Sequence, residues 1–449
     1  MEFKGKKVLV CGLARSGQSA ARLLAQLGAK VVAQDLKDEV EWNFTSSEEM
    51  EEMGIELMLG KNPDDIVESF DLVVISPGIP FDLPFLEKAR SKNIPVWGEV
   101  ELGYRLCSCP IIAITGTNGK TTVTTLVGEI LQRHNHQTVV AGNIGIPFTE
   151  HVEFLEPDNC VVAEISSFQL ETTYEFAPAI SAVLNITPDH LDRHKTMAIY
   201  QATKERIFAN QSPDDFAILG YDNAACRGMT PPSKKIYFSA KEQLDTGVFI
   251  DNGMIRAKLF DKDISIIEID KCRILPDNAL AATAICLCAG VPPKIIAEGL
   301  LDFKGVAHRI EYVTTINGIE FFNDSKATNT DSAIKGLEAM QHPVVLIGGG
   351  YDKKSSFGDW VRCFNDKVKH LIVLGEVTEQ IIETCRAYGF NKYDQVNSLR
   401  DAVQLAYAKA EPGDCVLLSP ACASWDMFDN FEQRGDLFKQ FVFELTPPV

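Results

Sequence analysis

Residues 111–122 read Ile-Ile-Ala-Ile-Thr-Gly-Thr-Asn-Gly-Lys-Thr-Thr, and this stretch decides the predicted fold. Its first four residues are apolar and mostly β-branched, which predicts a buried strand. A Gly-Thr-Asn-Gly turn follows, and apolar residues then recur at helical spacing through residues 123–131. The stretch therefore predicts a strand, a glycine-rich turn and a helix start, the unit from which α/β domains are built.

A glycine-rich turn that opens a helix is a phosphate-binding arrangement. Its backbone N–H groups can surround phosphate oxygens, and the helix N-terminus adds partial positive charge. Lys120 is placed to reach the outer phosphates, and the Thr121 hydroxyl is placed to ligate Mg²⁺. The usual loop has a further glycine where this chain has Ile114, so we predict a shortened loop. The alternative, a turn that merely ends a strand, gives Lys120 and the threonines no role.

Composition limits what the chain can do. Its 449 residues are many for one core and predict two to four domains. The 62 acidic residues outnumber 43 basic ones, which argues against a nucleic-acid partner. No apolar run approaches the roughly 18 residues of a membrane span, and we expect a cytoplasmic protein. The 12 cysteines are scattered through apolar segments, which favours reduced thiols over disulfides or a zinc site.

Strand and helix patterns alternate along the chain, which predicts an α/β fold of three consecutive domains. Residues 1–98 are predicted to form a Rossmann-like domain and residues 99–304 a central domain like that of phosphate-loop ATPases. Residues 305–449 are predicted to form a second Rossmann-like domain. Residues 247–270 alternate in polarity and predict a small β insertion in the central domain.

The first domain carries two turns at predicted strand ends. The turn at residues 12–17 lacks the middle glycine of a dinucleotide fingerprint, because Ala14 occupies that place. Asp35 ends the next strand, at the spacing from which an acid meets a ribose hydroxyl. A second turn, residues 76–78, reads Ser-Pro-Gly, which is also ordinary turn chemistry. NAD and other nucleotide diphosphates both suit this pattern.

Ionisable residues follow two strands of the predicted central domain. Glu164 ends a strand that reads Val-Val-Ala, a position from which an acid can hold nucleotide-bound Mg²⁺. His190 lies among the ionisable residues 189–194, where spacing supports a ligand role and a structural role about equally. Lys204 lies in a predicted helix and, by pattern alone, is an ordinary surface lysine.

Two lysines follow strands of the predicted third domain. They are Lys326, in an Asn-Asp-Ser-Lys segment, and Lys353, in Tyr-Asp-Lys-Lys. Two cations at strand ends of one domain suit a small substrate that bears carboxylates. A solvated lysine is nevertheless the commoner outcome for this residue type.

Five segments taken in chain order resemble the Mur ligase family: residues 116–121, 164–169, 189–194, 323–329 and 419–424. The resemblance spans nearly the whole chain. The segments at 164–169 and 323–329 resemble most closely the member that adds D-glutamate to UDP-N-acetylmuramoyl-L-alanine in peptidoglycan synthesis. The resemblance implies that ATP phosphorylates the alanyl carboxylate and that the amine of D-glutamate attacks the acyl phosphate. We therefore expect these two substrates, a monomeric state and no nucleic-acid partner.

The resemblance also implies roles for individual residues. It assigns ATP to Gly116, Thr117, Asn118, Gly119, Lys120, Thr121, Thr122, Asn278, Arg309 and Asp324. It assigns two Mg²⁺ ions to Thr121, Glu164, His190 and Lys204, with Lys204 carbamylated, because an ammonium group cannot ligate a metal. It assigns the UDP-sugar to Ser16, Asp35, Ser76, Pro77, Gly78 and Asn143, and D-glutamate to Lys326, Thr328, Lys353, Ser424 and Phe431. The implied catalytic residues are Lys120, His190, Lys204 and His308.

Two positions depart from the family pattern. Residues 272–277 lack the His-Asn pair that the family usually carries shortly before the position of Asn278. Trp425 stands where similar enzymes often have Leu, which bears on the shape of the implied D-glutamate pocket.

Three alternatives stay open from the sequence. One is another amide ligase of the superfamily, with a different amino acid or polyglutamate as substrate; the domain ahead of the loop favours a UDP-sugar instead. The second is an NAD-dependent dehydrogenase, against which Ala14 and the lack of a hydride-transfer set both count. The third is a non-catalytic nucleotide-binding regulator, against which Lys120, Glu164, His190 and Lys204 count.

Overall fold

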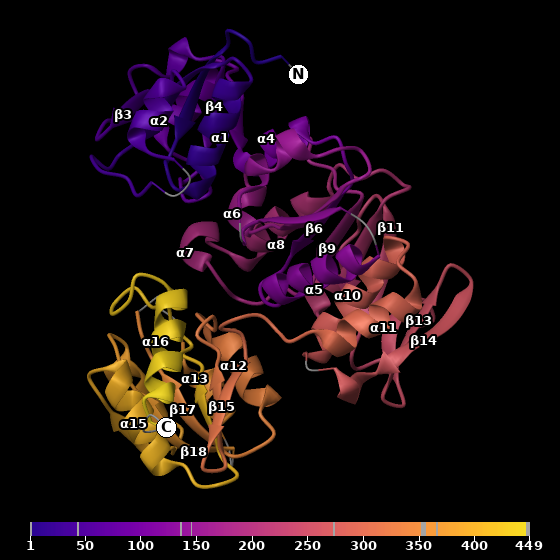
Figure 1. Ribbon diagram of the computed structural model, residues 1–449, viewed down its shortest axis with the longest axis vertical. Helices are drawn as coiled ribbons and strands as arrows, with labels where there is room; N and C mark the ends of the chain where they lie inside the picture. Colours follow the sequence, from indigo (N-terminus) through magenta and orange to yellow (C-terminus); the bar gives the residue numbers. More distant parts are fainter. Residues whose placement is uncertain are drawn as a thin grey trace. The chain divides into compact units, whose positions relative to one another are not determined.

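The computed structural model describes residues 2–42, 45–134, 137–144, 146–272, 274–351, 356–364 and 367–445. Internal packing divides the chain into two compact units, Met1–Phe303 and Lys304–Val449. The first unit holds two β-sheets and the second unit holds one (Figure 1). This mixed α/β architecture confirms the predicted fold class. The predicted domain boundary after residue 304 lies next to the division between the two units. The predicted boundary after residue 98 lies inside the first unit. Both domain boundaries stay predictions.

The first sheet is entirely parallel, in the order β3-β2-β1-β4-β5. Its strands are β1 (Lys7–Cys11), β2 (Lys30–Asp35), β3 (Glu56–Leu59), β4 (Leu72–Ile75) and β5 (Val96–Gly98). The helices of this part are α1 (Arg15–Gln26), α2 (Ser47–Glu52), α3 (Pro84–Ser91) and α4 (Glu99–Leu106). Because β1 lies between β2 and β4, the turns that follow these three strands meet at one sheet edge.

The second sheet has the order β14-β13-β12-β11-β10-β9-β6-β8-β7. Its strands are β6 (Ile111–Thr115), β7 (Thr138–Gly142), β8 (Cys160–Glu164), β9 (Ile180–Val183), β10 (Phe216–Gly220), β11 (Lys234–Ser239), β12 (Gly247–Asp251), β13 (Met254–Leu259) and β14 (Lys262–Glu268). The predicted β insertion is not separate: β12 pairs in parallel with β11, and β13 and β14 then continue the main sheet in antiparallel fashion.

Seven helices belong to this second part of the first unit among the described residues. They are α5 (Lys120–Arg133), α6 (Ser167–Leu170), α7 (Leu191–His194), α8 (Met197–Glu205), α9 (Ala224–Arg227), α10 (Pro276–Cys288) and α11 (Pro293–Asp302). Helices α5 and α10 pack side by side against the sheet (Figure 1). All five residues of β6 are buried, as their β-branched character predicts.

The sheet of the second unit has the order β15-β16-β20-β17-β18-β19, parallel except for the β15–β16 hairpin. Its strands are β15 (Glu311–Ile316), β16 (Ile319–Asn323), β17 (Val344–Gly348), β18 (Val368–Val373), β19 (Tyr393–Gln395) and β20 (Cys415–Leu418). Its helices are α12 (Thr330–Ala339), α13 (Gly358–Arg362), α14 (Thr378–Ala387), α15 (Leu399–Lys409) and α16 (Phe431–Phe443). None of the helices in the described ranges is long and apolar enough to cross a bilayer.

Candidate active site

The predicted phosphate-binding loop is present between β6 and α5. Gly119 is the N-cap of α5, with a left-handed φ of 85° that favours glycine. A Cβ atom at Gly119 would lie 2.4 Å from Oδ1 of Asn278. Glycine is therefore required there, and the Asn278 side chain, from the start of α10, lies directly against the loop. That position fits the predicted ATP contact of Asn278.

Asn185, the second residue after β9, holds the loop in place. The backbone N–H of Asn118 donates to Asn185 Oδ1 (2.9 Å), and Asn185 Nδ2 donates back to the Asn118 carbonyl (3.1 Å). The Thr117 N–H also donates to the backbone carbonyl of Asn185 (2.9 Å). Sequence reasoning assigned Asn185 no role, although its place at the carboxyl end of a strand beside β6 was a usable signal.

Two lysines converge on one carbonyl oxygen of the loop. Lys120 Nζ donates to the carbonyls of Gly116 (2.9 Å) and Thr117 (2.8 Å). Lys204 Nζ, from α8, also donates to the Gly116 carbonyl (2.9 Å) and to Thr115 Oγ1 (3.3 Å). Two ammonium groups on one oxygen repel each other, so one of them gains from being uncharged.

Lys204 is only 1% exposed, so its interpretation as a surface lysine is wrong. Tyr200, Thr203 and Lys204 form the buried face of α8, and the Lys204 ammonium lies 4.8 Å from the centroid of the Tyr200 ring. Burial lowers the pKa of Lys204 well below its ordinary value, and the charge of Lys120 lowers it further. A buried lysine with a lowered pKa beside a nucleotide loop is a marker of a functional site.

Glu164, at the end of β8, has the character of a cation ligand. Its side chain is 1% exposed, and Oε1 accepts from Asn143 Nδ2 (2.8 Å). Oε2 is buried and has no hydrogen-bond partner among the described residues. A buried carboxylate oxygen without a partner is costly, and a divalent cation would satisfy it. Glu164 and the nearby loop thus fit the implied Mg²⁺.

His190 begins the short helix α7 in a left-handed conformation, with φ of 52°. Its ring packs against Phe168 with centroids 4.8 Å apart, and its Nε2 lies 3.6 Å from Asp189 Oδ2. The side chain keeps 38% of its surface exposed. Within the described ranges, no three His, Cys, Asp or Glu side chains gather into a metal cluster.

Arg193, three residues after His190, joins the two sheets of the first unit. Its guanidinium pairs with Glu171 and lies 4.1 Å from the centroid of the Phe168 ring. The same guanidinium donates to the carbonyls of Pro77 (2.9 Å) and Ile79 (3.0 Å). The turn predicted to bind the UDP-sugar is therefore held by a side chain of the central part, a link that sequence reasoning missed.

The predicted UDP-sugar residues of the first sheet lie at one edge. Asp35 Oδ2 accepts from the Leu13 N–H (2.8 Å), so this acid shapes the first turn. Ser76 Oγ donates to the Gly12 carbonyl (2.7 Å), which ties the two turns together. A Cβ atom at Gly17 would lie 1.8 Å from the Gly12 carbonyl oxygen, so α1 can start this close to the turn only with glycine. Ser16 and Gly78 lie in these same turns.

In the second unit, His308 and Asp324 are buried. Asn323 Nδ2 donates to His308 Nδ1 (3.0 Å), and the ring also packs on Gly435, where a Cβ would lie 2.2 Å from Nδ1. Burial lowers the pKa of His308, and the charge of Lys439 lowers it further. Burial raises the pKa of Asp324 to about 6, although Ser419 Oγ donates to it (2.8 Å). Arg309 lies 3.9 Å from the Asp324 carboxylate.

The predicted D-glutamate residues follow the adjacent parallel strands β16 and β20. The Lys326 ammonium lies 5.2 Å from the centroid of the Phe431 ring, which brings the two loops together. Ser424 is buried, and Thr328 is half-buried beside Lys326. Lys353 lies outside the described residues. Trp425 is 63% exposed and its ring lies 5.7 Å from that of Tyr351.

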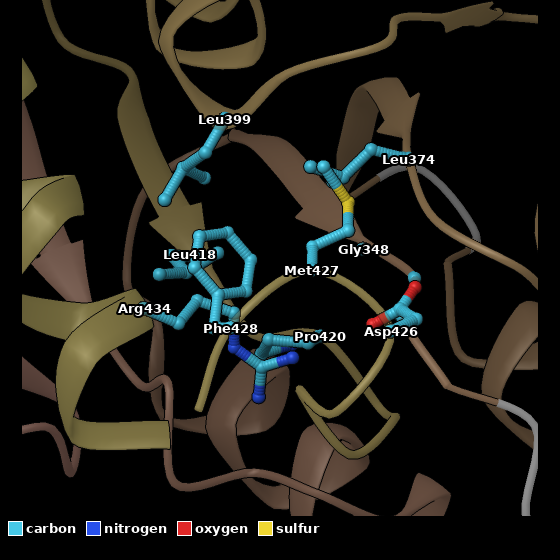
Figure 2. Close-up of a pocket in the computed structure, with 11 residues that line it drawn as sticks. Gly348, Leu374, Leu399, Leu418, Pro420, Asp426, Met427, Phe428 and Arg434 are labelled. Carbon is cyan, nitrogen blue, oxygen red and sulfur yellow. The ribbon is translucent and has the colours of Figure 1, made fainter. Parts of the chain in front are cut away.

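Arg434, on α16, fixes both of these loops and was also missed. Its buried guanidinium donates to the carbonyls of Ser325 (2.8 Å), Cys422 (3.1 Å) and Ala423 (3.2 Å). Burial lowers its pKa to about 10. Figure 2 shows Arg434 and Asp426 lining a cavity beside the glycine turn after β17. Its volume of about 10 Å³ holds about one water molecule, so it is not an amino-acid site.

Known proteins match this chain over nearly its whole length. Residues 6–98 match the family model "Mur ligase MurD-like, N-terminal domain", residues 114–285 match "Mur ligase middle domain", and residues 308–422 match "Mur ligase, glutamate ligase domain". Proteins named UDP-N-acetylmuramoylalanine–D-glutamate ligase from Alkaliphilus metalliredigens and Pelotomaculum thermopropionicum are 47% and 48% identical to it, over 99% of this chain and of each relative. The chain belongs to the Mur ligase family.

Solved structures of Mur ligases share the fold at low identity. The Thermotoga maritima UDP-N-acetylmuramate–alanine ligase MurC is 16% identical with a TM-score of 0.61, covering 98% of this chain and 100% of that one. The MurF ligase of the same organism, solved in complex with ADP, is 14% identical with a TM-score of 0.60, covering 99% and 97%. Membership of the Mur ligase family confirms the resemblance predicted from the five segments and the predicted enzyme class, an ATP-dependent ligase. It leaves the dehydrogenase alternative without support.

Proposed function

We propose that this Mur ligase is a cytoplasmic, monomeric enzyme that joins D-glutamate to UDP-N-acetylmuramoyl-L-alanine at the expense of ATP. The observation that carries the proposal is the identity of 47% and 48%, over 99% of the chain, with relatives of that name. The site supports the reaction class, because a phosphate-binding loop, a buried acid and a buried lysine lie together at the carboxyl edge of the second sheet.

The loop binds and orients the triphosphate. Backbone N–H groups and the start of α5 hold phosphate oxygens, while Lys120 exchanges its two loop carbonyls for outer phosphate oxygens. Thr121 and Glu164 would hold one Mg²⁺ ion, and His190 with a carbamylated Lys204 would hold a second. When bound, these ions neutralise charge on the phosphoryl group that moves to the alanyl carboxylate. The acyl phosphate then accepts the amine of D-glutamate, and phosphate leaves.

Burial prepares Lys204 for carbamylation. Because its pKa is lowered by burial and by Lys120, a larger fraction of the amine is neutral near pH 7 than for an exposed lysine. The nitrogen lone pair attacks CO₂, an N–C bond forms, and one amine proton passes to solvent. The product is an anion, so the repulsion between Lys120 and Lys204 at the Gly116 carbonyl becomes attraction.

The second unit binds the amino acid in this proposal. Lys326, with Lys353 in the same role, pairs with the carboxylates of D-glutamate, and Thr328 and Ser424 supply polar contacts. The Phe431 ring packs beside Lys326 and limits the shape of the site. His308, Arg309 and Asp324 complete the ATP-binding and catalytic set that the family resemblance implies.

An assay of phosphate release tests the proposed substrates. We expect release from ATP only when UDP-N-acetylmuramoyl-L-alanine and D-glutamate are both present, with a product whose mass equals that of the two joined less one water. L-Glutamate and L-lysine serve as matched amino-acid controls. Equal release with L-glutamate, or release that does not need the sugar nucleotide, would overturn the assignment.

The link made by Arg193 predicts a selective effect on the UDP-sugar. In Arg193→Ala, the carbonyls of Pro77 and Ile79 lose their donor, and Glu171 loses its arginine partner and keeps His194 beside it. We expect the KM for the sugar nucleotide to rise by about tenfold, with a smaller change in the KM for ATP. Steady-state kinetics with each substrate varied in turn measures the difference.

Arg227→Ala is the matched control, because Arg227 also stacks on an aromatic ring, that of Tyr221, at 5.0 Å. The turn at residues 76–78 is held by Arg193 and not by Arg227, so Arg227→Ala should leave both KM values unchanged. If Arg193→Ala raises both KM values equally, then Arg193 supports the fold in general and does not position the turn.

A further inference from the structure

A groove of about 330 Å³ lies at the edge of the second sheet opposite the phosphate-binding loop. Its floor is formed where the parallel strands β6, β8 and β9 begin, with Ile112, Cys160 and Ile180 all at least nine-tenths buried. Cys288 and Ala289, at the end of α10, form one wall. The volume lies within the range of small-molecule sites, roughly 300–1,000 Å³.

The described residues that line the groove include four Asp or Asn residues, of which three are acidic and the fourth, Asn159, is buried. Asp158, Asp214 and Asp215 line it, and Asp214 and Asp158 are exposed to solvent. Lys234 lies beside Asp214: its Nζ is 3.5 Å from Asp214 Oδ1 and 5.3 Å from the centroid of the Phe216 ring. Of the three carboxylates, that of Asp214 is paired with Lys234 and that of Asp215 accepts from the Ser212 N–H (2.6 Å), so the lining keeps an excess of negative charge.

Two helices add to this negative potential. Both α5, through Leu131 near its last turn, and α10, through Cys288, end at the groove. Carbonyl groups at a helix C-terminus carry partial negative charge and favour cations. Apolar side chains on the floor cannot replace the water shell of a metal ion, so the favoured cation is organic.

We propose that this groove binds an organic cation with an apolar body, of the class of alkyl- and arylalkyl-ammonium ions. The apolar part lies on Ile112 and Ile180, and the ammonium group lies at the mouth near Asp158 and Asp214. The groove shares no residue with the sites assigned to ATP, Mg²⁺, the UDP-sugar or D-glutamate. The proposal is therefore independent of the proposed function, and binding can be measured without the ligase reaction.

Three probes of one shape test the charge preference on the full-length protein by isothermal titration calorimetry. They are 2-phenylethylammonium, the neutral 2-phenylethanol and the anionic 3-phenylpropanoate. We expect one site per chain, with a Kd on the order of 1 mM for the ammonium ion. Binding should be at least about fivefold weaker for the alcohol and not detectable for the carboxylate. Equal binding of all three, or no binding of the ammonium ion, overturns the proposal.

Variants locate the site. Ala289→Phe fills the groove and should abolish binding, whereas Ala387→Phe, at the exposed end of α14, should not. The double variant Asp158→Asn with Asp214→Asn should weaken binding of the ammonium ion by about fivefold. Glu51→Gln with Glu52→Gln makes the same change in net charge on α2 and should leave the Kd unchanged.

The charge variants keep the test decisive if Ala289→Phe does not fold, which ADP binding and thermal unfolding would reveal. If the Asp158 and Asp214 variant binds the ammonium ion as tightly as the parent chain, or if a folded Ala289→Phe still binds it, then the probe lies elsewhere and the proposal fails.

Discussion

Replacing Lys120 by alanine is expected to lower kcat for amide formation by about 1,000-fold. In the proposed function, the ammonium group of Lys120 is the cation that the loop supplies to the outer phosphates. In this structure it donates to the Gly116 and Thr117 carbonyls, which holds it against the loop. Its loss removes charge stabilisation that matters most when the phosphoryl group moves.

The measurement is phosphate release under saturating substrates, together with the affinity for ADP. Lys294→Ala is the matched control, since Lys294 lies on α11 with 88% of its side chain exposed. The control should keep full activity and the same thermal unfolding midpoint. Amide formation at the normal rate in Lys120→Ala would contradict the assigned role of the loop.

Replacing Lys204 by arginine is expected to abolish activity to a similar extent, although it keeps a positive charge. Arginine cannot form a carbamate, so a loss in Lys204→Arg separates the carbamate from the cation. The parent enzyme should also lose activity when bicarbonate and CO₂ are removed, and regain it when they are restored. Exposed lysines lack the burial that lowers the Lys204 pKa, so Lys294→Arg should show none of these effects.

A direct observation checks the same residue without relying on turnover. With ¹³C-labelled bicarbonate, the parent chain should give one carbamate carbon resonance that is missing in Lys204→Arg. The resonance is measured on the parent chain, which has no substitution. A carbamate signal there is therefore independent of any folding defect in Lys204→Arg. Activity that is indifferent to bicarbonate, together with no carbamate resonance, would show that Lys204 acts as an amine.

Local patterns predicted the elements near the loop well. The β-branched run at residues 111–114, the glycine turn and the helical spacing after Lys120 each specify their structure over a few residues, and the structure confirms all three. The strand end that carries Glu164 was also predicted, because buried parallel strands read as short apolar runs.

Pairing over long distances could not be predicted in the same way. The alternating polarity of β12–β14 correctly predicted strands. The local sequence does not show that β12 pairs with β11 and extends the sheet. Arg193 and Arg434 were missed for the same reason, since each acts through backbone carbonyls of turns far away in sequence.

Lys204 is a different case, because a signal was present. Tyr200, Thr203, Lys204 and Ile207 follow the spacing of one helical face, and that face is buried in the structure. A lysine on an apolar face is uncommon, since burying an ammonium group costs free energy. The position of Lys204 on this face was the signal that could have identified it, and sequence reasoning did not use it.

The guanidinium of Arg434 has a consequence for how the second unit opens. It extends from α16 and donates to carbonyls of the loop after β16 and of the loop after β20. If either loop moved away, the buried guanidinium would lose hydrogen-bond acceptors. Amide protons on both loops should therefore exchange with deuterium at one common rate, as a single cooperative unit. The proposed D-glutamate site would then be rigid on each side before any substrate arrives.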